Sequence, residues 1–123
     1  MTRPKSERRK YPRIVRRLPI RLAANGYDFE TITQNVSCVG AYCHINKYIP
    51  PFTKVMIKLS LPIMTDNSKK NYAVECKGVV VRAVDEAKGG FNIAVLFNQI
   101  KEGQRKIISR YISQFLPKKP SRL

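Results

Sequence analysis

Two arginines four positions apart stand near the N-terminus. Arg9 and Arg13 enclose the sequence Lys-Tyr-Pro, and Arg8 precedes them. Pro12 disfavours helix, and side chains four apart on an extended chain point to the same side, roughly 13 Å apart along it. A guanidinium can stack on a purine, pair with a phosphate, or donate to O6 and N7 of guanine. The segment is therefore suited to a planar anionic ligand, although an arginine-rich stretch contains this spacing by chance.

A second group of polar residues follows in the sequence Asn-Val-Ser-Cys-Val-Gly. Asn35 and Ser37 are two positions apart, so on a strand they share a face. An amide can bond a base edge, and a hydroxyl can bond a phosphate or a base. Gly40 lacks a Cβ, which permits a bulge and a close approach of the backbone to a ligand. The alternative is that Asn35 and Ser37 end a strand with bonds to the nearby backbone.

Catalytic and metal-binding patterns do not stand out. The single histidine, His44, follows Cys43 on a predicted strand, where neighbouring side chains point to opposite faces. No nucleophile elbow, phosphate-binding loop or metal-ligand spacing occurs. The three cysteines, which are Cys38, Cys43 and Cys76, are odd in number and form no Cys-x-x-Cys pair. The sequence predicts neither an enzyme nor a metalloprotein.

Length and charge narrow the class of protein. The 123 residues are 43% hydrophobic, enough for one domain with a buried core. The formal net charge of +16 favours an anionic partner such as a nucleotide, nucleic acid, membrane surface or acidic protein. No apolar run approaches the roughly 18 residues that span a bilayer, and the charged start resembles no secretory signal. We expect a cytoplasmic protein without a transmembrane segment.

Alternation of apolar and polar residues predicts six strands, at 18–24, 27–36, 41–45, 55–61, 72–84 and 91–97. Hairpin signals follow the first and fifth of these strands, Gly78 predicts a bend, and 62–71 is expected to be a loop. Apolar residues then recur at helical spacing from Ile107 to Phe115. These elements predict an antiparallel β-barrel with one helix packed on it. The chain divides into a flexible basic arm at 1–16, the barrel with its helix at 17–116, and a tail at 117–123.

Taken together, the two motifs resemble those of the PilZ family, which carries Arg-x-x-x-Arg before the first barrel strand and Asp/Asn-x-Ser-x-x-Gly some twenty to thirty residues later. The stretches 76–82 and 91–97 resemble two later barrel strands of the family. The resemblance covers roughly Arg8 to Phe115. One departure is Ala94, where many members carry glycine, and its effect on affinity is open.

The resemblance implies a mainly β fold, namely a six-stranded antiparallel PilZ-type barrel with a C-terminal helix and an extended basic N-terminal arm. It implies a non-enzymatic receptor of cyclic di-GMP, a bacterial second messenger, bound as one molecule or an intercalated pair. The arm would close over the dinucleotide and signal to a downstream effector protein in motility, exopolysaccharide or biofilm regulation. The implied ligand-binding residues are Arg8, Arg9, Arg13, Asn35, Ser37 and Gly40.

Two other functions fit the same sequence. A basic β-barrel that binds nucleic acid would account for the pI near 10.2, although the aromatic residues are not interleaved with basic ones in a stacking pattern. An adaptor with an inactive ligand site would act through protein contacts alone. The sequence leaves open the partner, the choice between monomer and dimer, and the role of the excess positive charge.

Overall fold

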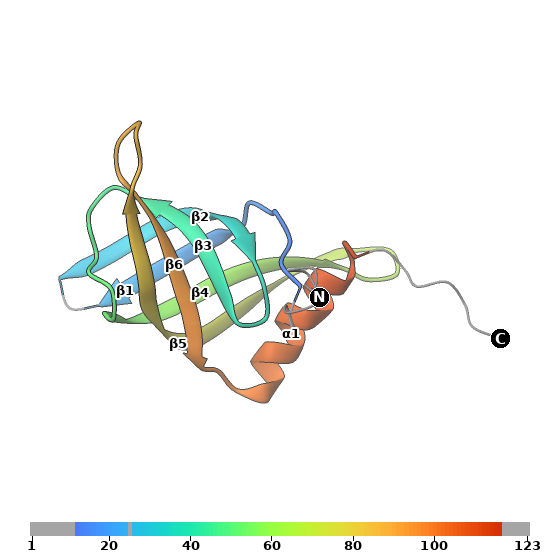
Figure 1. Ribbon diagram of the computed structural model, residues 1–123. Coiled ribbons are helices and arrows are strands. Elements are labelled where there is room, and N and C mark those ends of the chain that lie inside the picture. Colours follow the sequence, from blue (N-terminus) through green and yellow to red (C-terminus); the bar gives the residue numbers. More distant parts are fainter. Residues whose placement is uncertain (1–11, 25, 117–123) are drawn as a thin grey trace, which may run out of the picture.

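The computed structural model describes residues 12–24 and 26–116, which form six strands and one helix (Figure 1). The elements are β1 (Pro19–Ala24), β2 (Tyr27–Val36), β3 (Gly40–Ile45), β4 (Lys54–Met64), β5 (Lys69–Asp85), β6 (Phe91–Gln99) and α1 (Glu102–Ser113). The strands close into an antiparallel barrel in the order β1-β2-β3-β6-β5-β4. The predicted fold is confirmed. Most of the predicted arm (1–11), Asn25 and the predicted tail (117–123) lie outside the described residues.

The barrel interior is filled by alternate residues of every strand. On β4, Val55, Ile57 and Leu59 are at most 4% exposed, whereas the residues between them face outward. Leu22 on β1, Cys43 on β3 and Val80 on β5 are completely buried. This burial removes the apolar side chains from water, and each large one contributes roughly 1.5–3 kcal/mol to folding. The alternation therefore fixes which side chains remain on the outer surface.

The prediction of a loop at 62–71 is wrong. β4 continues to Met64 and β5 begins at Lys69, and a turn closed by hydrogen bonds between Thr65 and Ser68 joins them. The polar residues and the proline of this stretch resemble a loop, but Ile63 is 1% exposed, so the strand keeps its inward face. Pro62 is tolerated opposite Asn71 because that ladder position requires no N–H from it. The result is a long β4–β5 hairpin that extends past β1 and β6.

Helix α1 covers the extended part of this hairpin (Figure 1). Its buried side chains are Ile108, Tyr111 and Ile112. Two glutamines fasten it to the strand backbones: Gln104 Oε1 accepts a hydrogen bond from the N–H of Glu75 at 2.8 Å, and Gln114 Oε1 accepts from that of Met64 at 3.1 Å. The helix thus completes the core where the hairpin leaves the barrel.

Two features at the ends of the predicted segments differ from the sequence pattern. The helix begins several residues before the apolar stripe, and Phe115, the last residue of that stripe, lies beyond its end. The Phe115 ring instead lies 3.9 Å from the guanidinium carbon of Arg16, a cation–π contact. Gly78 lies at a register shift between β5 and β6, as its position in the strand predicted.

Candidate ligand site

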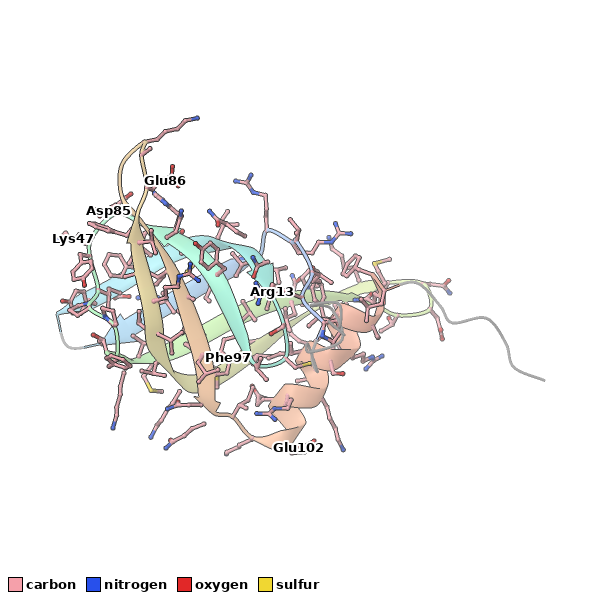
Figure 2. The ribbon with its side chains drawn as sticks, in the orientation of Figure 1. Arg13, Lys47, Asp85, Glu86, Phe97 and Glu102 are labelled. Carbon is pink, nitrogen blue, oxygen red and sulfur yellow. The ribbon has the colours of Figure 1, made fainter. Side chains whose placement is uncertain are left out.

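The segment before β1 is held against β2. Ile14 and Val36 exchange two backbone hydrogen bonds of 3.0 Å, and Ile14 is 8% exposed. Further on, the buried Thr33 hydroxyl accepts from the N–H of Leu18 at 2.9 Å and donates to the carbonyl of Arg16 at 2.6 Å. Because the pairing is antiparallel, Arg13 lies beside the end of β2, near the β2–β3 connection (Figure 2).

Four outward-facing residues from four strands stand in one line across the barrel. Asn35 of β2 pairs with Tyr42 of β3, Tyr42 pairs with Ala94 of β6, and Ala94 pairs with Arg82 of β5. We call these residues the cross-strand row. Register shifts on β2 and β5 adjoin its two ends, between Thr33 and Asn35 and between Val80 and Arg82. Backbone pairing therefore fixes the spacing of the side chains in the row.

A cavity of about 230 Å³ lies over this row. It contains four of the six ligand-binding residues expected from the sequence, Arg13, Asn35, Ser37 and Gly40. The other two, Arg8 and Arg9, lie outside the described residues. The rest of the lining comprises Val39, Ala41, Tyr42, Val81, Arg82, Ala94, Val95 and Leu96. Residues distant in sequence thus meet at one place on the barrel.

The site carries positive charge. Among the residues that the structure describes, its lining includes the guanidinium groups of Arg13 and Arg82 and no carboxylate. Among residues 12–24 and 26–116, the ion pairs are Arg21–Asp28 at 3.0 Å and Lys58–Glu75 at 3.7 Å, and neither touches this cavity. Both site arginines are exposed, and neither forms an ion pair with another described residue, so an anion entering the cavity would meet their charge.

The sequence of this chain is similar to that of a known family. A family model described as PilZ domain matches residues 7–114. The chain belongs to the PilZ domain family. At the level of that family, the domain is a binding module for cyclic di-GMP rather than an enzyme. None of the curated proteins compared with this sequence matches it.

A solved structure supports the fold of this PilZ domain. The Bacillus subtilis inhibitor of motility, MotI/DgrA, superposes with a TM-score of 0.72 at 16% sequence identity. The match covers 86% of the present chain and 50% of MotI/DgrA, so the chain spans half the length of that protein. At this identity the likeness concerns the fold of the domain.

Ser37 and Gly40 also have roles in the barrel itself. The N–H of Ser37 donates to the carbonyl of Gly40 at 2.8 Å, and the Ser37 hydroxyl accepts from the N–H of Val39 at 3.2 Å. The local bonds considered as an alternative from the sequence therefore exist, yet the bond from Val39 leaves the hydroxyl proton of Ser37 available to a ligand. A Cβ on Gly40 would lie 2.5 Å from the carbonyl oxygen of Val95, so the approach of β6 already requires glycine there.

Sequence reasoning missed Arg82 and Tyr42 as site residues. With strict alternation from the buried Val80, Arg82 would point into the core. The register shift between Val80 and Arg82 instead turns Arg82 outward and leaves Val81 44% exposed at the rim. A charged residue at an inward position of an otherwise regular strand was the signal that could have predicted this bulge.

The neighbours His44 and Cys43 face different surroundings, as expected. His44 Nδ1 lies 3.1 Å from Asn92 Oδ1, and the Asn92 amide donates to Glu86 at 2.8 Å. Cys43 faces the core, and its burial raises the pKa of its thiol to about 12. Within the part of the chain that the structure describes, no group of three or more His, Cys, Asp or Glu side chains is arranged to hold a metal ion, and no helix has the length and apolarity to cross a membrane.

Proposed function

We propose that this PilZ domain is a receptor for cyclic di-GMP and that the dinucleotide binds over the cross-strand row. The single observation that carries the proposal is the convergence of Arg13, Asn35 and Arg82 on one cavity, whose described lining residues include no carboxylate. A small ligand with two phosphates and two guanines needs charge, hydrogen-bond donors and flat contact surfaces together. The family membership of the chain supports the same ligand.

Each side chain has a role that follows from its chemistry. Arg13 donates to a phosphate or stacks on a guanine, and Arg82 supplies a second cation from the far end of the row. The Asn35 amide reads a guanine edge, and the Ser37 hydroxyl donates to a phosphate or base oxygen. Tyr42 offers a half-buried ring beside Ala94 on which a base can rest. None of these steps breaks a covalent bond.

In this proposal the arm that precedes Arg13 completes the site. Arg8 and Arg9 add guanidinium groups to the ligand. Of the segment 6–16 expected to become ordered on binding, Ile14 and Arg16 are already hydrogen-bonded to β2, so the ordering concerns residues 6–13. The pairing of Ile14 with Val36 supports this, because it anchors the arm where it meets the cavity. Amide hydrogen exchange in 6–13 should slow when cyclic di-GMP is added, whereas the amide of Ile14 should already be protected. Unchanged exchange would show that the arm does not close.

We propose further that the ordered arm is the signal read by a downstream effector protein. Arg8 stands immediately before the Arg-x-x-x-Arg motif, where its charge favours the doubly loaded, intercalated pair of ligand molecules. Calorimetric stoichiometry decides this point. Two ligands per chain are expected, and one per chain would remove the role assigned to Arg8.

Isothermal titration with cyclic di-GMP tests the receptor function directly. Saturable binding is expected, with GTP and a single-stranded RNA as controls that bind far more weakly. Repeating the titration at increasing salt separates the ligand classes. A receptor for a small dinucleotide makes few phosphate contacts and loses affinity gradually, whereas a general nucleic-acid binder loses it steeply over many phosphate contacts. Absence of heat with cyclic di-GMP, together with strong salt-sensitive RNA binding, would overturn the proposal.

A further inference from the structure

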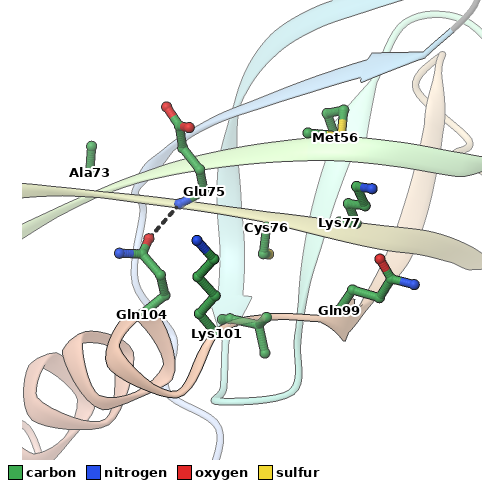
Figure 3. Close-up of a pocket in the computed structure, with 9 residues that line it drawn as sticks. Met56, Ala73, Glu75, Cys76, Lys77, Gln99, Lys101 and Gln104 are labelled. Carbon is green, nitrogen blue, oxygen red and sulfur yellow. Dashed lines mark hydrogen bonds between the residues drawn. The ribbon is translucent and has the colours of Figure 1, made fainter.

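One edge of the β5 strand has no neighbouring strand over part of its length. Lys77 of β5 pairs with Gln99, the last residue of β6, and the chain then turns away into α1. β5 itself begins at Lys69, so residues 69–76 pair with β4 on one side only. Figure 3 shows this stretch, with the start of α1 beside it.

The backbone N–H and C=O groups of alternate residues on this edge point away from β4. The N–H of Glu75 donates to Gln104 Oε1 at 2.8 Å rather than to β4, so Glu75 and Lys58 form a pair without ladder hydrogen bonds. Because the ladder repeats every two residues, Ala73 and Asn71 direct their N–H and C=O groups outward as well. The partner of Asn71 is Pro62, which lacks an N–H and fits such a pair. Gln104 thus occupies one of a series of strand-pairing positions.

A groove adjoins this edge. Its volume is about 840 Å³, and it is lined by Met56, Ala73, Glu75, Cys76, Lys77, Gln99, Ile100, Lys101 and Gln104. We call it the β5-edge groove. Lys77 and Lys101 project into it, and the apolar side chain of Met56 is 52% exposed (Figure 3). Its one carboxylate, on Glu75, lies 3.7 Å from the ammonium of Lys58. The groove therefore presents positive charge, an apolar contact and free backbone groups.

We propose that the β5-edge groove binds an extended, acidic segment of a partner protein, which adds to β5 as a further strand. Its backbone pairs with residues 71–75 and displaces the Gln104 amide from Glu75. Alternate acidic side chains meet Lys77 and Lys101, and an apolar side chain contacts Met56. The charge of the groove determines the chemistry of the occupant, and its concave shape beside an open strand edge favours a peptide over a flat lipid surface. The groove has no lining residue in common with the cavity over the cross-strand row.

A labelled peptide is the direct probe. An eight-residue fluorescent peptide of alternating glutamate and valine should bind the full chain saturably, as measured by fluorescence anisotropy at moderate salt. The same peptide with lysine in place of glutamate should bind at least tenfold more weakly. Failure of the acidic peptide to bind at millimolar protein, or equal binding of the two peptides, would overturn the proposal. Stronger binding to phosphatidylglycerol vesicles than to the peptide would also overturn it, in favour of a lipid surface.

Two variants locate the binding on this edge. Ala73→Pro removes an outward N–H that β4 does not use, so the edge strand tolerates it while peptide pairing is blocked. Lys77→Glu combined with Lys101→Glu reverses the charge of the groove. Each should weaken peptide binding at least tenfold. The matched control is Lys47→Glu combined with Lys88→Glu, which makes the same change in net charge on exposed residues outside the groove and should leave binding within twofold.

Thermal unfolding and gel filtration complete the test. If Ala73→Pro fails to fold, the variant with Lys77→Glu and Lys101→Glu still tests the binding site, because both lysines are exposed and their substitution should not prevent folding. Equal loss of binding in the charge-reversal pair and its control would show that general charge attracts the peptide, which overturns the assigned site. If the wild type forms a concentration-dependent dimer and Ala73→Pro abolishes that dimer, a second copy of the chain occupies the edge. This result would also overturn the proposal.

Discussion

The two sites proposed for this PilZ domain use different parts of the polypeptide. At the cross-strand row, backbone pairing joins β2, β3, β6 and β5 into one continuous surface, and recognition depends on side chains such as Asn35 and Arg82. At the β5-edge groove, the backbone N–H and C=O groups of Ala73 point away from β4, and recognition depends on main-chain groups of this kind. A small ligand with distinct edges suits the first arrangement. A chain of any sequence with the right charge suits the second.

β5 contributes to both sites and is divided between them by two register shifts. One lies between Lys77 and Gly78, where β6 ends, and the other lies between Val80 and Arg82, where the row begins. Between them Gly78 packs so closely that a Cβ there would meet the side chain of Ile57 and lie 2.6 Å from the carbonyl oxygen of Leu96. The strand between the two sites is therefore fixed by packing. Substitutions in one site should therefore leave binding at the other unchanged.

The largest effect is expected from Arg13→Ala. Removal of a guanidinium that contacts an anionic ligand costs roughly 1.5–3 kcal/mol for each charged hydrogen bond lost, so affinity for cyclic di-GMP should fall by about 100-fold or more. The melting temperature should barely change, since Arg13 is exposed. Arg17→Ala is the matched control, because this exposed arginine of the same segment is absent from the cavity lining. If titration calorimetry shows that Arg13→Ala binds cyclic di-GMP with wild-type affinity, the proposed site is wrong.

Gly40→Ala tests whether the packing of β3 against β6 requires glycine at this position. The new methyl would collide with the carbonyl oxygen of Val95, 2.5 Å away, so the protein should lose about 1–3 kcal/mol of stability and several degrees of melting temperature. Gly103→Ala is the control, since nothing lies within 4 Å of a Cβ there, and alanine is the better helix former. Calorimetry of unfolding measures both. Equal melting temperatures for the two variants would show that β6 moves to accommodate the methyl group.

These residues show where sequence reasoning is strong and where it fails. The alternation in β4 and the helical spacing of Ile108 and Ile112 predicted the barrel and its helix, because burial on one face imposes a period. Pro62 was misread as a loop signal because proline is disfavoured in most strand positions, and only the pairing partner reveals that this position needs no N–H.

The sequence motifs included only part of the candidate site for a similar reason. Asn35, Ser37 and Gly40 are close in sequence, so a motif could identify them. Arg82 and Tyr42 join them only through the register of β3, β6 and β5, which the local sequence does not encode. The bulge at Val81, which turns Arg82 outward, depends on pairing with β6. The groove was not predicted from the sequence. The β5 edge is open only because its neighbour β6 ends at Gln99, and the sequence of β5 does not show where β6 ends.

Arg82→Ala tests the residue that the motifs did not predict. One charged contact at the end of the row should be lost, so affinity for cyclic di-GMP should fall about tenfold, equivalent to roughly 1.4 kcal/mol. Lys77→Ala, five positions earlier on the same strand, removes a cation from the other site and should leave this affinity within twofold. Calorimetric titration of both variants decides the matter. Equal losses would mean that the total charge of β5, rather than its geometry, attracts the dinucleotide.

Alkaline unfolding compares the interior beneath the two sites. Burial raises the pKa of Cys43 to about 12 and that of Cys76 to about 11, whereas an unfolded thiol ionises near 9. The stability that these neutral thiols retain below pH 9 is lost as the pH rises toward the folded values, because only the unfolded chain releases the proton. At about pH 9.5 each thiol should cost roughly 0.8 kcal/mol. Urea unfolding of Cys43→Val and Cys76→Val between pH 8 and 9.5 should show a shallower decline than the wild type, and an unchanged slope would contradict this account.

The smallest effect is expected from Ala94→Gly, which tests the departure of this chain from many family members. Ala94 lies between Tyr42 and Arg82, so its methyl group stands in the middle of the row over which the ligand is proposed to bind. Glycine should allow a base to approach the strand more closely and raise affinity two- to fivefold, at a cost in strand stability below about 1 kcal/mol. Ala73→Gly pays the same backbone cost on the β5 edge, outside the cavity over the row. If both variants leave cyclic di-GMP affinity unchanged in calorimetry, the bases contact the side chains at the ends of the row and not its centre.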